Sequence, residues 1–273
     1  MDSRPLMEAA ESAESAAAEL VRQHRHKERF TALQAPWQVD DAAFAYAVQE
    51  EFVRQLERLR GTRTCGYKIA LTTPAMRRMV GYHDSVSGRL LADQMLPSGS
   101  AVRASDYGRL LIEFEIAFQI ATDLPAGGAS WSRQSILPYV ACAFAALEIA
   151  DDRNADYAGI AGSILTLAAD NAWNQGLVLG APVTTFTPDS LLAATGIACI
   201  DGEEVGRGTG ADVLGHPLDA LAWLAGHLQE RGLALAAGHL VTTGSLVTSK
   251  FPVAGNTVDF RIEGLGSVRL VVQ

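Results

Sequence analysis

The segment Ile112-Glu113-Phe114-Glu115-Ile116-Ala117-Phe118-Gln119-Ile120 alternates large apolar residues with small or polar ones. This period of two predicts a β-strand whose apolar side lies in the core. Glu113 and Glu115 share the other side, about 6.5 to 7 Å apart at ~3.3 Å per residue, so their carboxylates can converge on one ion. The alternative is that both lie on the solvated face of an edge strand.

A second apolar segment, Phe144-Ala145-Ala146-Leu147-Glu148-Ile149-Ala150, follows a short helix expected over 135–143 and is interpreted as another core strand. Glu148 lies inside it, where an unpaired carboxylate is costly. One interpretation is a structural salt bridge to Arg153. The other is that Glu148 joins Glu113 and Glu115 as the third carboxylate of a metal site. Oxygen ligands alone suit Mg²⁺ or Mn²⁺, and three of them leave positions for water and a chelating substrate.

Lys68 belongs to a third alternating segment, in which Tyr67, Ile69 and Leu71 face one side. If that side is core, Lys68 faces whatever cavity the strand borders, where a lysine can bind a carboxylate or move a proton. The alternative is a surface lysine. Asp84 and Arg153 are polar loop candidates, and both are residue types that also serve in turns and on surfaces.

The remaining pattern predicts a mixed α+β architecture. Two amphipathic helices come first, and the second has Asp40 and Asp41 as candidate N-caps and stops at Gly61. Asp201-Gly202 predicts a tight hairpin, residues 217–231 a helix, and the last strands are expected to be antiparallel. Because helices precede strands, this class is favoured over a doubly wound sheet. The expected division is a helical segment over 1–62 and a catalytic core over 63–273.

Composition excludes several classes of function. The net charge of −9 provides no basic stripe for nucleic acid. No segment is long and apolar enough for a membrane span, and the acidic N-terminus does not resemble a signal peptide. Cys65, Cys142 and Cys199 are odd in number and widely spaced, which argues against disulfides and structural zinc and indicates a reducing, cytoplasmic location.

Short motifs along nearly the whole chain carry a family resemblance. In order, they are Ala45-Tyr46-Ala47-Val48-Gln49, Gly66-Tyr67-Lys68-Ile69-Ala70-Leu71-Thr72, Gly88-Arg89-Leu90-Leu91-Ala92-Asp93, the strand 112–118, Ala146-Leu147-Glu148-Ile149, Ala169-Asp170-Asn171-Ala172, Leu214-Gly215-His216-Pro217-Leu218 and Thr243-Gly244-Ser245-Leu246. The ordered set resembles the 2-keto-4-pentenoate hydratase and 4-oxalocrotonate decarboxylase branch of the fumarylacetoacetate hydrolase superfamily.

The resemblance implies a twisted, barrel-like mixed β core behind N-terminal helices. It also implies a Mg²⁺ or Mn²⁺ ion bound by Glu113, Glu115 and Glu148, with Lys68 beside the bound oxo acid as an acid/base or orienting group. A homo-oligomer is expected, with the N-terminal helices as candidate contacts.

One departure from the family pattern concerns an aspartate. Relatives that hydrate 2-hydroxypentadienoate carry it in a P-D-[FY]-G motif before the segment that begins here at Gly88, whereas this chain has Ser85-Val86-Ser87. Asp84, two positions upstream, is the candidate replacement. A smaller departure is His239, which stands where Gly-Asp is common.

The function expected from the resemblance is a metal-dependent hydratase of aromatic-compound catabolism. It adds water at C4 of a 2-hydroxy-2,4-dienoate, with Lys68 shuttling a proton or holding the carboxylate, Asp84 as a second acid/base, and Arg153 and Ser245 as substrate contacts. The alternatives are a 2-oxo-dienedioate decarboxylase or an acylpyruvate C–C hydrolase on the same site. A further alternative is a catalytically silent homologue that partners a decarboxylase or hydratase of the pathway.

Overall fold

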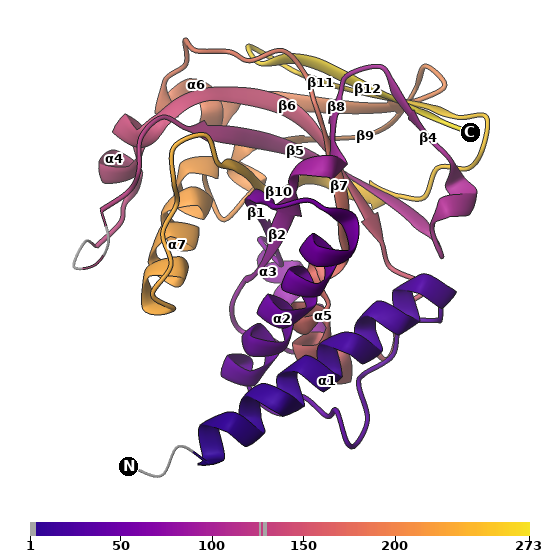
Figure 1. Ribbon diagram of the computed structural model, residues 1–273. Coiled ribbons are helices and arrows are strands. Elements are labelled where there is room, and N and C mark those ends of the chain that lie inside the picture. The colour runs from indigo at the N-terminus through magenta and orange to yellow at the C-terminus, as the bar shows by residue number, and fades with distance from the viewer. Residues whose placement is uncertain (1–3, 126, 128–129) are drawn as a thin grey trace.

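The computed structural model describes residues 4–125, 127 and 130–273. Two curled sheets form the upper part of the molecule in Figure 1, and the N-terminal helices lie below them. None of the helices in these described ranges has the length and hydropathy to cross a membrane.

The larger sheet has seven strands in the order β2-β1-β10-β5-β6-β7-β3. Their bounds are β1 Thr64–Ala70, β2 Val86–Leu91, β3 Met95–Pro97, β5 Leu110–Ile120, β6 Val140–Asp151, β7 Asn174–Leu179 and β10 Leu240–Lys250. β1 pairs parallel with β10, Gly66 beside Leu240. A Cβ on Gly66 would come within 1.9 Å of the Leu240 carbonyl oxygen, so this close approach requires glycine.

The smaller sheet has the order β4-β12-β11-β8-β9. Its strands are β4 Ser100–Val102, β8 Thr195–Ile200, β9 Glu203–Thr209, β11 Thr257–Ile262 and β12 Gly266–Val272. The predicted hairpin is confirmed, since Asp201 and Gly202 between β8 and β9 have φ values of 53° and 86°. Such positive angles at both positions suit a tight two-residue turn.

The helices cover the larger sheet and one end of the molecule. The α-helices are α1 Arg4–His26, α2 Ala42–Arg60, α3 Pro74–Val80, α4 Arg133–Ile136, α5 Ile164–Ala169, α6 Pro188–Ala193 and α7 Pro217–Glu230. Short 3-10 helices are η1 Ala92–Gln94, η2 Ala104–Asp106, η3 Leu137–Tyr139, η4 Ile160–Ser163, η5 Asn171–Trp173 and η6 Gly210–Asp212. The capping prediction for α2 is confirmed, because Asp41 accepts from the Phe44 amide and Gly61 is left-handed.

The N-terminal helices share a hydrophobic cluster with later segments. Ala17 and Leu20 of α1 and Phe52 of α2 belong to the same buried cluster as Leu71 and Leu167. The expected boundary between residues 62 and 63 stays a prediction, but apolar packing crosses it.

Two sequence expectations are corrected. The helix expected over 135–143 ends at Tyr139, and β6 begins at Val140, because the segment joins the sheet opposite β5. The last strands are not all antiparallel. β10 pairs parallel with β1, and β12 pairs parallel with β4. Hydrophobic patterning predicts strands but leaves their partners open.

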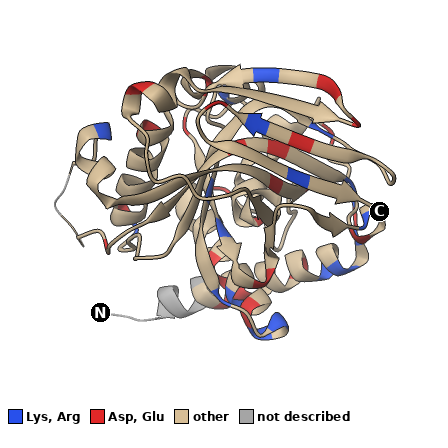
Figure 2. Ribbon diagram, turned by 90° about the horizontal axis from the view of Figure 1, so that it is seen from above, with Lys and Arg blue, Asp and Glu red and all other residues tan. Residues whose placement is uncertain are grey.

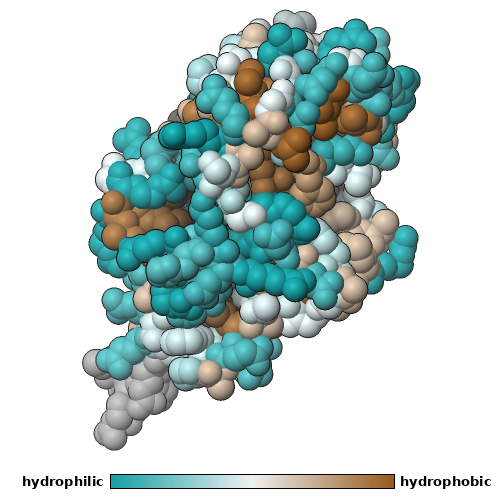
Figure 3. Space-filling view, turned by 90° about the vertical axis from the view of Figure 1, so that its right-hand side faces the viewer, coloured by the Kyte–Doolittle hydropathy of each residue, from teal (hydrophilic) through white to brown (hydrophobic). Residues whose placement is uncertain are grey.

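The surface carries charges of both signs. Figure 2 shows basic and acidic residues interspersed along the strands turned toward the viewer. On the face shown in Figure 3, hydrophobic residues gather mainly in the upper half, over the sheets, and the lower half is mostly hydrophilic.

Candidate metal and substrate site

The pairing of β5 with β6 brings three glutamates together. Glu113 lies directly opposite Glu148 across the two strands, and Glu115 is two residues along β5 on the same face. One carboxylate oxygen from each lies within 4.8 Å of the others. The interpretation of Glu113 and Glu115 as residues of a solvated edge is wrong, because β5 is a central strand and Glu115 is fully buried.

Lys68 of β1 completes the cluster. Its Nζ lies 3.1 Å from Glu148 Oε1 and 3.8 Å from Glu113 Oε2. The side chain is almost entirely buried, so the alternative of a surface lysine is wrong. In the sheet, β10 lies between β1 and β5. The curl of the sheet brings the Lys68 side chain across to the glutamates.

Three further contacts hold the carboxylates. The Gly244 amide donates to Glu115 Oε2 at 2.8 Å, Asn174 Nδ2 donates to Glu148 Oε1 at 2.9 Å, and the Ser249 hydroxyl donates to Glu113 Oε1 at 3.0 Å. Sequence reasoning missed all three donors. Gly244 stands in the Thr-Gly-Ser-Leu motif, but no pattern in the sequence marks Asn174 or Ser249 as a neighbour of the glutamates.

Burial dominates the electrostatics of the cluster. It raises the pKa of Glu115 well above the ordinary value of 4.5, and the nearby Glu148 and Glu113 raise it further. Burial also raises the pKa of Glu148, although Lys68 opposes this shift. For Lys68 burial alone would lower the pKa, but the carboxylates outweigh it and raise the pKa above its ordinary value.

A divalent cation fits these residues. With all three carboxylates ionised, the single ammonium group leaves two negative charges uncompensated in a largely buried place, and a bound cation would compensate them. Among the described residues, Glu115 Oε1 and Glu148 Oε2 are buried with no hydrogen-bond partner, so each has a lone pair free to bind a metal. The donors are all hard oxygen atoms, which Mg²⁺ and Mn²⁺ prefer.

A cavity of about 340 Å³ opens beside Glu113. It lies where β1 ends and separates from β10, and its lining includes Leu71, Thr72, Met76 and Leu246. Among the lining side chains that the structure describes, none is Lys, Arg or His, and the charged ones are Glu113 and Asp212. The cavity therefore offers an apolar and hydroxyl-bearing surface next to the carboxylate cluster.

Ser245 lines this cavity, but its hydroxyl is already engaged. It donates to the Val247 carbonyl at 2.6 Å and accepts from the Phe114 amide at 2.8 Å. Ser245 thus lies next to the cluster, and its role as a substrate contact stays a prediction.

Asp84 does not lie at the cluster. It is exposed and accepts a hydrogen bond from Trp223 Nε1 at 3.0 Å, in a separate groove beside α7. Val86 instead pairs with Ala70 on the sheet side that carries Lys68, and Val86 is buried among apolar residues. The structure thus does not bring Asp84 together with the glutamates, and its replacement of the family aspartate stays a prediction.

Arg153 is also placed elsewhere. It is fully buried, and its Nη2 pairs with Asp170 Oδ2 at 2.5 Å. The alternative salt bridge to Glu148 is wrong, since Glu148 is paired with Lys68, and the role of Arg153 as a substrate contact stays a prediction. The left-handed backbone of Arg153, with φ of 45°, turns its side chain toward α1.

Comparison with known proteins gives consistent matches. Residues 90–273 match the family described as fumarylacetoacetate (FAA) hydrolase C-terminal. The chain is 34% identical over 229 residues to a 2-keto-4-pentenoate hydratase of Burkholderia vietnamiensis, covering 84% of this chain and 85% of the relative. It is 31% identical over 226 residues to a 4-oxalocrotonate decarboxylase of Pseudomonas putida, with 83% of each covered.

A solved structure is similar over almost the whole chain. It is the 4-oxalocrotonate decarboxylase of Pseudomonas putida G7 complexed with magnesium and adipate, with a TM-score of 0.86 and 26% identity. The match covers 96% of this chain and 98% of that chain. The resemblance drawn from the motifs and the mixed α+β fold class are confirmed.

Proposed function

The chain belongs to the fumarylacetoacetate hydrolase family, and we propose that it is a divalent-metal-dependent hydratase acting on a 2-hydroxy-2,4-dienoate. The observation that carries this proposal is the cluster of Glu113, Glu115 and Glu148 beside Lys68. Relatives named hydratases, including a 2-hydroxyhexa-2,4-dienoate hydratase of Comamonas testosteroni at 32% identity, support the reaction type.

The reaction balances as an addition of water. The water oxygen adds to C4 and keeps one hydrogen. The other proton of water and the enol proton at C2 account for the protons gained at C3 and C5, which gives a 4-hydroxy-2-oxo acid. A bound Mg²⁺ or Mn²⁺ ion, held by Glu113, Glu115 and Glu148, would supply positive charge that stabilises the developing oxyanion.

Lys68 is the residue of this chain that we assign to orientation and proton transfer. The carboxylates around it favour its ammonium form, which suits binding the substrate carboxylate or donating a proton. Gly244, Asn174 and Ser249 fix the glutamates through hydrogen bonds. The apolar sheet interior behind them, formed by Ala117, Ala146 and Leu177 among others, excludes water from that side.

The cavity lining favours the hydratase over decarboxylation of a dienedioate. A dienedioate would bring a second carboxylate into a space whose charged lining residues are Glu113 and Asp212, both acidic. A monocarboxylate with an apolar tail meets Leu71, Met76 and Leu246 instead. Uncompensated like charges in a desolvated cavity are costly, so the uncharged tail is the better match.

The experiment follows the dienol absorbance of 2-hydroxypenta-2,4-dienoate with purified protein and Mg²⁺. Glu113→Gln and Glu148→Gln are each expected to reduce the rate by at least about 100-fold, because each removes a charged ligand. Glu203→Gln, on the exposed β9 hairpin, is the matched control and should retain wild-type activity. Wild-type activity in Glu113→Gln would contradict the site.

The decarboxylase is the second candidate, because the similar solved structure is a 4-oxalocrotonate decarboxylase. Release of CO₂ from 2-oxo-dienedioate without loss of the monocarboxylate dienol would select it, and two-fragment products from an acylpyruvate would select the hydrolase. Absence of Mg²⁺ binding in a calorimetric titration would select a catalytically silent homologue.

A cytoplasmic location is supported by the three free cysteines, and the proposed homo-oligomer is tested by sedimentation.

A further inference from the structure

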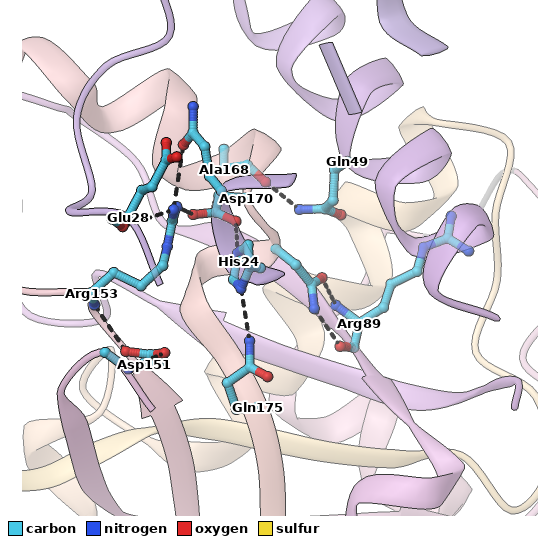
Figure 4. Close-up of polar contacts among 12 residues, drawn as sticks. His24, Glu28, Gln49, Arg89, Asp151, Arg153, Ala168, Asp170 and Gln175 are labelled. Carbon is cyan, nitrogen blue, oxygen red and sulfur yellow. Dashed lines mark hydrogen bonds and ion pairs between the residues drawn. The ribbon is translucent and has the colours of Figure 1, made fainter. Parts of the chain in front are cut away.

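A buried polar network joins α1 to the segment before β7. Asp170 is fully buried and accepts from two cationic or polar side chains, Arg153 Nη2 at 2.5 Å and His24 Nε2 at 2.5 Å. Arg153 also donates to Gln23 Oε1 and to the Glu28 carbonyl, both at 3.3 Å. Figure 4 shows His24 and Arg153 converging on Asp170 from different segments.

The residues after Asp170 adopt an unusual backbone conformation. Asn171, Ala172 and Trp173 have φ values of 53°, 48° and 62°, so three successive residues with side chains lie in the left-handed region. This region disfavours residues with a Cβ, and a run of three persists only where surrounding contacts impose it. Asp170 directly precedes this run and contributes the buried contacts with Arg153 and His24.

Both ends of this strained turn contact the elements of the site. The Asn171 side chain accepts from the Arg89 amide at 2.6 Å and donates to the Arg89 carbonyl at 2.9 Å. Arg89 is next to Gly88, which pairs with Lys68 across β1 and β2. At the other end, Asn174 donates to Glu148 Oε1 at 2.9 Å.

We propose that Asp170 is a positioning residue, which through its pairing with Arg153 and His24 holds the turn 171–173 so that Asn174 orients Glu148. In the described part of the chain, the Asp170 carboxylate bonds to His24 and Arg153 and to no residue of the cluster, so it acts through the turn. Because His24 comes from α1, the docking of the N-terminal helix contributes to the geometry of the cluster. This inference rests on the proposed function, since it assumes that Glu148 binds the metal.

The test measures the Mg²⁺ dissociation constant by isothermal titration calorimetry on purified full-length protein, without substrate. Asp170→Asn removes the charge and keeps the shape, and a 10- to 100-fold weaker affinity is expected, the usual effect of losing a residue that orients a metal ligand. Asn174→Ala is expected to weaken the affinity to a similar extent, and the double variant should lose no more than the larger single loss, because both act on the same ligand.

Asp152→Asn is the matched control. Asp152 directly follows β6, is also fully buried and is paired with an arginine, Arg109; among the residues that the structure describes, no hydrogen bond or ion pair joins Asp152 to the glutamates or Lys68. It should lower the thermal midpoint as Asp170→Asn does and leave the Mg²⁺ affinity within about twofold. A purely structural role for Asp170 would give equal affinities in the two variants, and that result overturns the inference.

The outcomes separate the two proposals. Wild-type protein that binds no Mg²⁺ contradicts the proposed function itself. Wild-type protein that binds Mg²⁺, with unchanged affinity in Asn174→Ala, overturns the inference alone. Should Asp170→Asn fail to fold, His24→Gln removes the other contact to Asp170, and an affinity equal to wild type in that variant also overturns it.

Discussion

Lys68 is the residue on which the charge balance of the site depends. Its ammonium group pairs with Glu148 and Glu113, and the carboxylates raise its pKa despite its burial. Lys68→Met should destabilise the metal-free protein by about 3 to 5 kcal/mol, because it leaves the glutamates without compensation. Urea denaturation in EDTA measures the loss, and Lys250→Met at the end of β10 is the control. Equal unfolding free energies for the two variants would contradict this account.

For single residues, strand alternation predicted which side chains share a face of a strand. It did not predict which side chains meet when one of them lies in a loop. Strand alternation placed Glu113 and Glu115 together, and the apolar setting of Glu148 marked it as exceptional. The positions of Arg153 and Asp84 away from the glutamates were not foreseen, because a polar loop residue carries no signal for the direction of its side chain. Asn174 was missed because its partner, Glu148, lies on a different strand, and residue spacing along the sequence does not show which residues of two strands meet.

At the scale of elements, an aromatic contact between α7 and α2 includes a pH-sensitive residue, His227. His227 stacks on Trp223 with ring centres 4.9 Å apart and lies 4.9 Å from Tyr46 of α2. Burial and the nearby Arg231 lower the pKa of His227 to about 4 from 6.5, and its Nε2 has no hydrogen-bond partner among the described residues. The folded protein therefore holds this imidazole in its neutral form.

The sign of the pH effect follows from this shift. Between pH 6.5 and 4 the unfolded chain takes up a proton that the folded chain does not, so stability falls as the pH falls through this window. His227→Phe keeps an aromatic ring and should reduce the loss between pH 7 and pH 5 by roughly 1 to 2 kcal/mol, allowing for solvent screening. Thermal or urea unfolding at the two pH values measures it. An identical loss in the variant and the wild type would contradict the assignment to His227.

Elements with strong local signals were predictable and their partners were not. The caps of α2 and the Asp201-Gly202 turn depend only on residues close together in the sequence, so both could be predicted from it. The start of β6 was misplaced because Val140 to Ala143 become a strand by pairing with β5, which is a long-range contact. The parallel pairing of β1 with β10 was not predicted for the same reason, since it is also a long-range contact.

At the scale of the whole molecule, cation binding should stabilise the fold. The site draws ligands from β5 and β6 and a lysine from β1, so a cation that binds only the folded protein adds about 2.7 kcal/mol at 100 times its dissociation constant. Since 1 kcal/mol shifts the thermal midpoint of a chain of this size by about 2 to 4 °C, we expect a rise of about 5 to 11 °C with Mg²⁺, which EDTA reverses. Glu115→Gln should abolish the rise, whereas Glu203→Gln should preserve it. A Mg²⁺-dependent rise that survives in Glu115→Gln would place the ion elsewhere.

The parallel contact of β1 with β10 also constrains the order of events during synthesis. Gly66 precedes its neighbour Leu240 by a long stretch of sequence, so β1 is synthesised well before β10. Until β10 emerges, the edge of β1 that faces it stays unpaired. Such a topology favours slow folding with exposed strand edges.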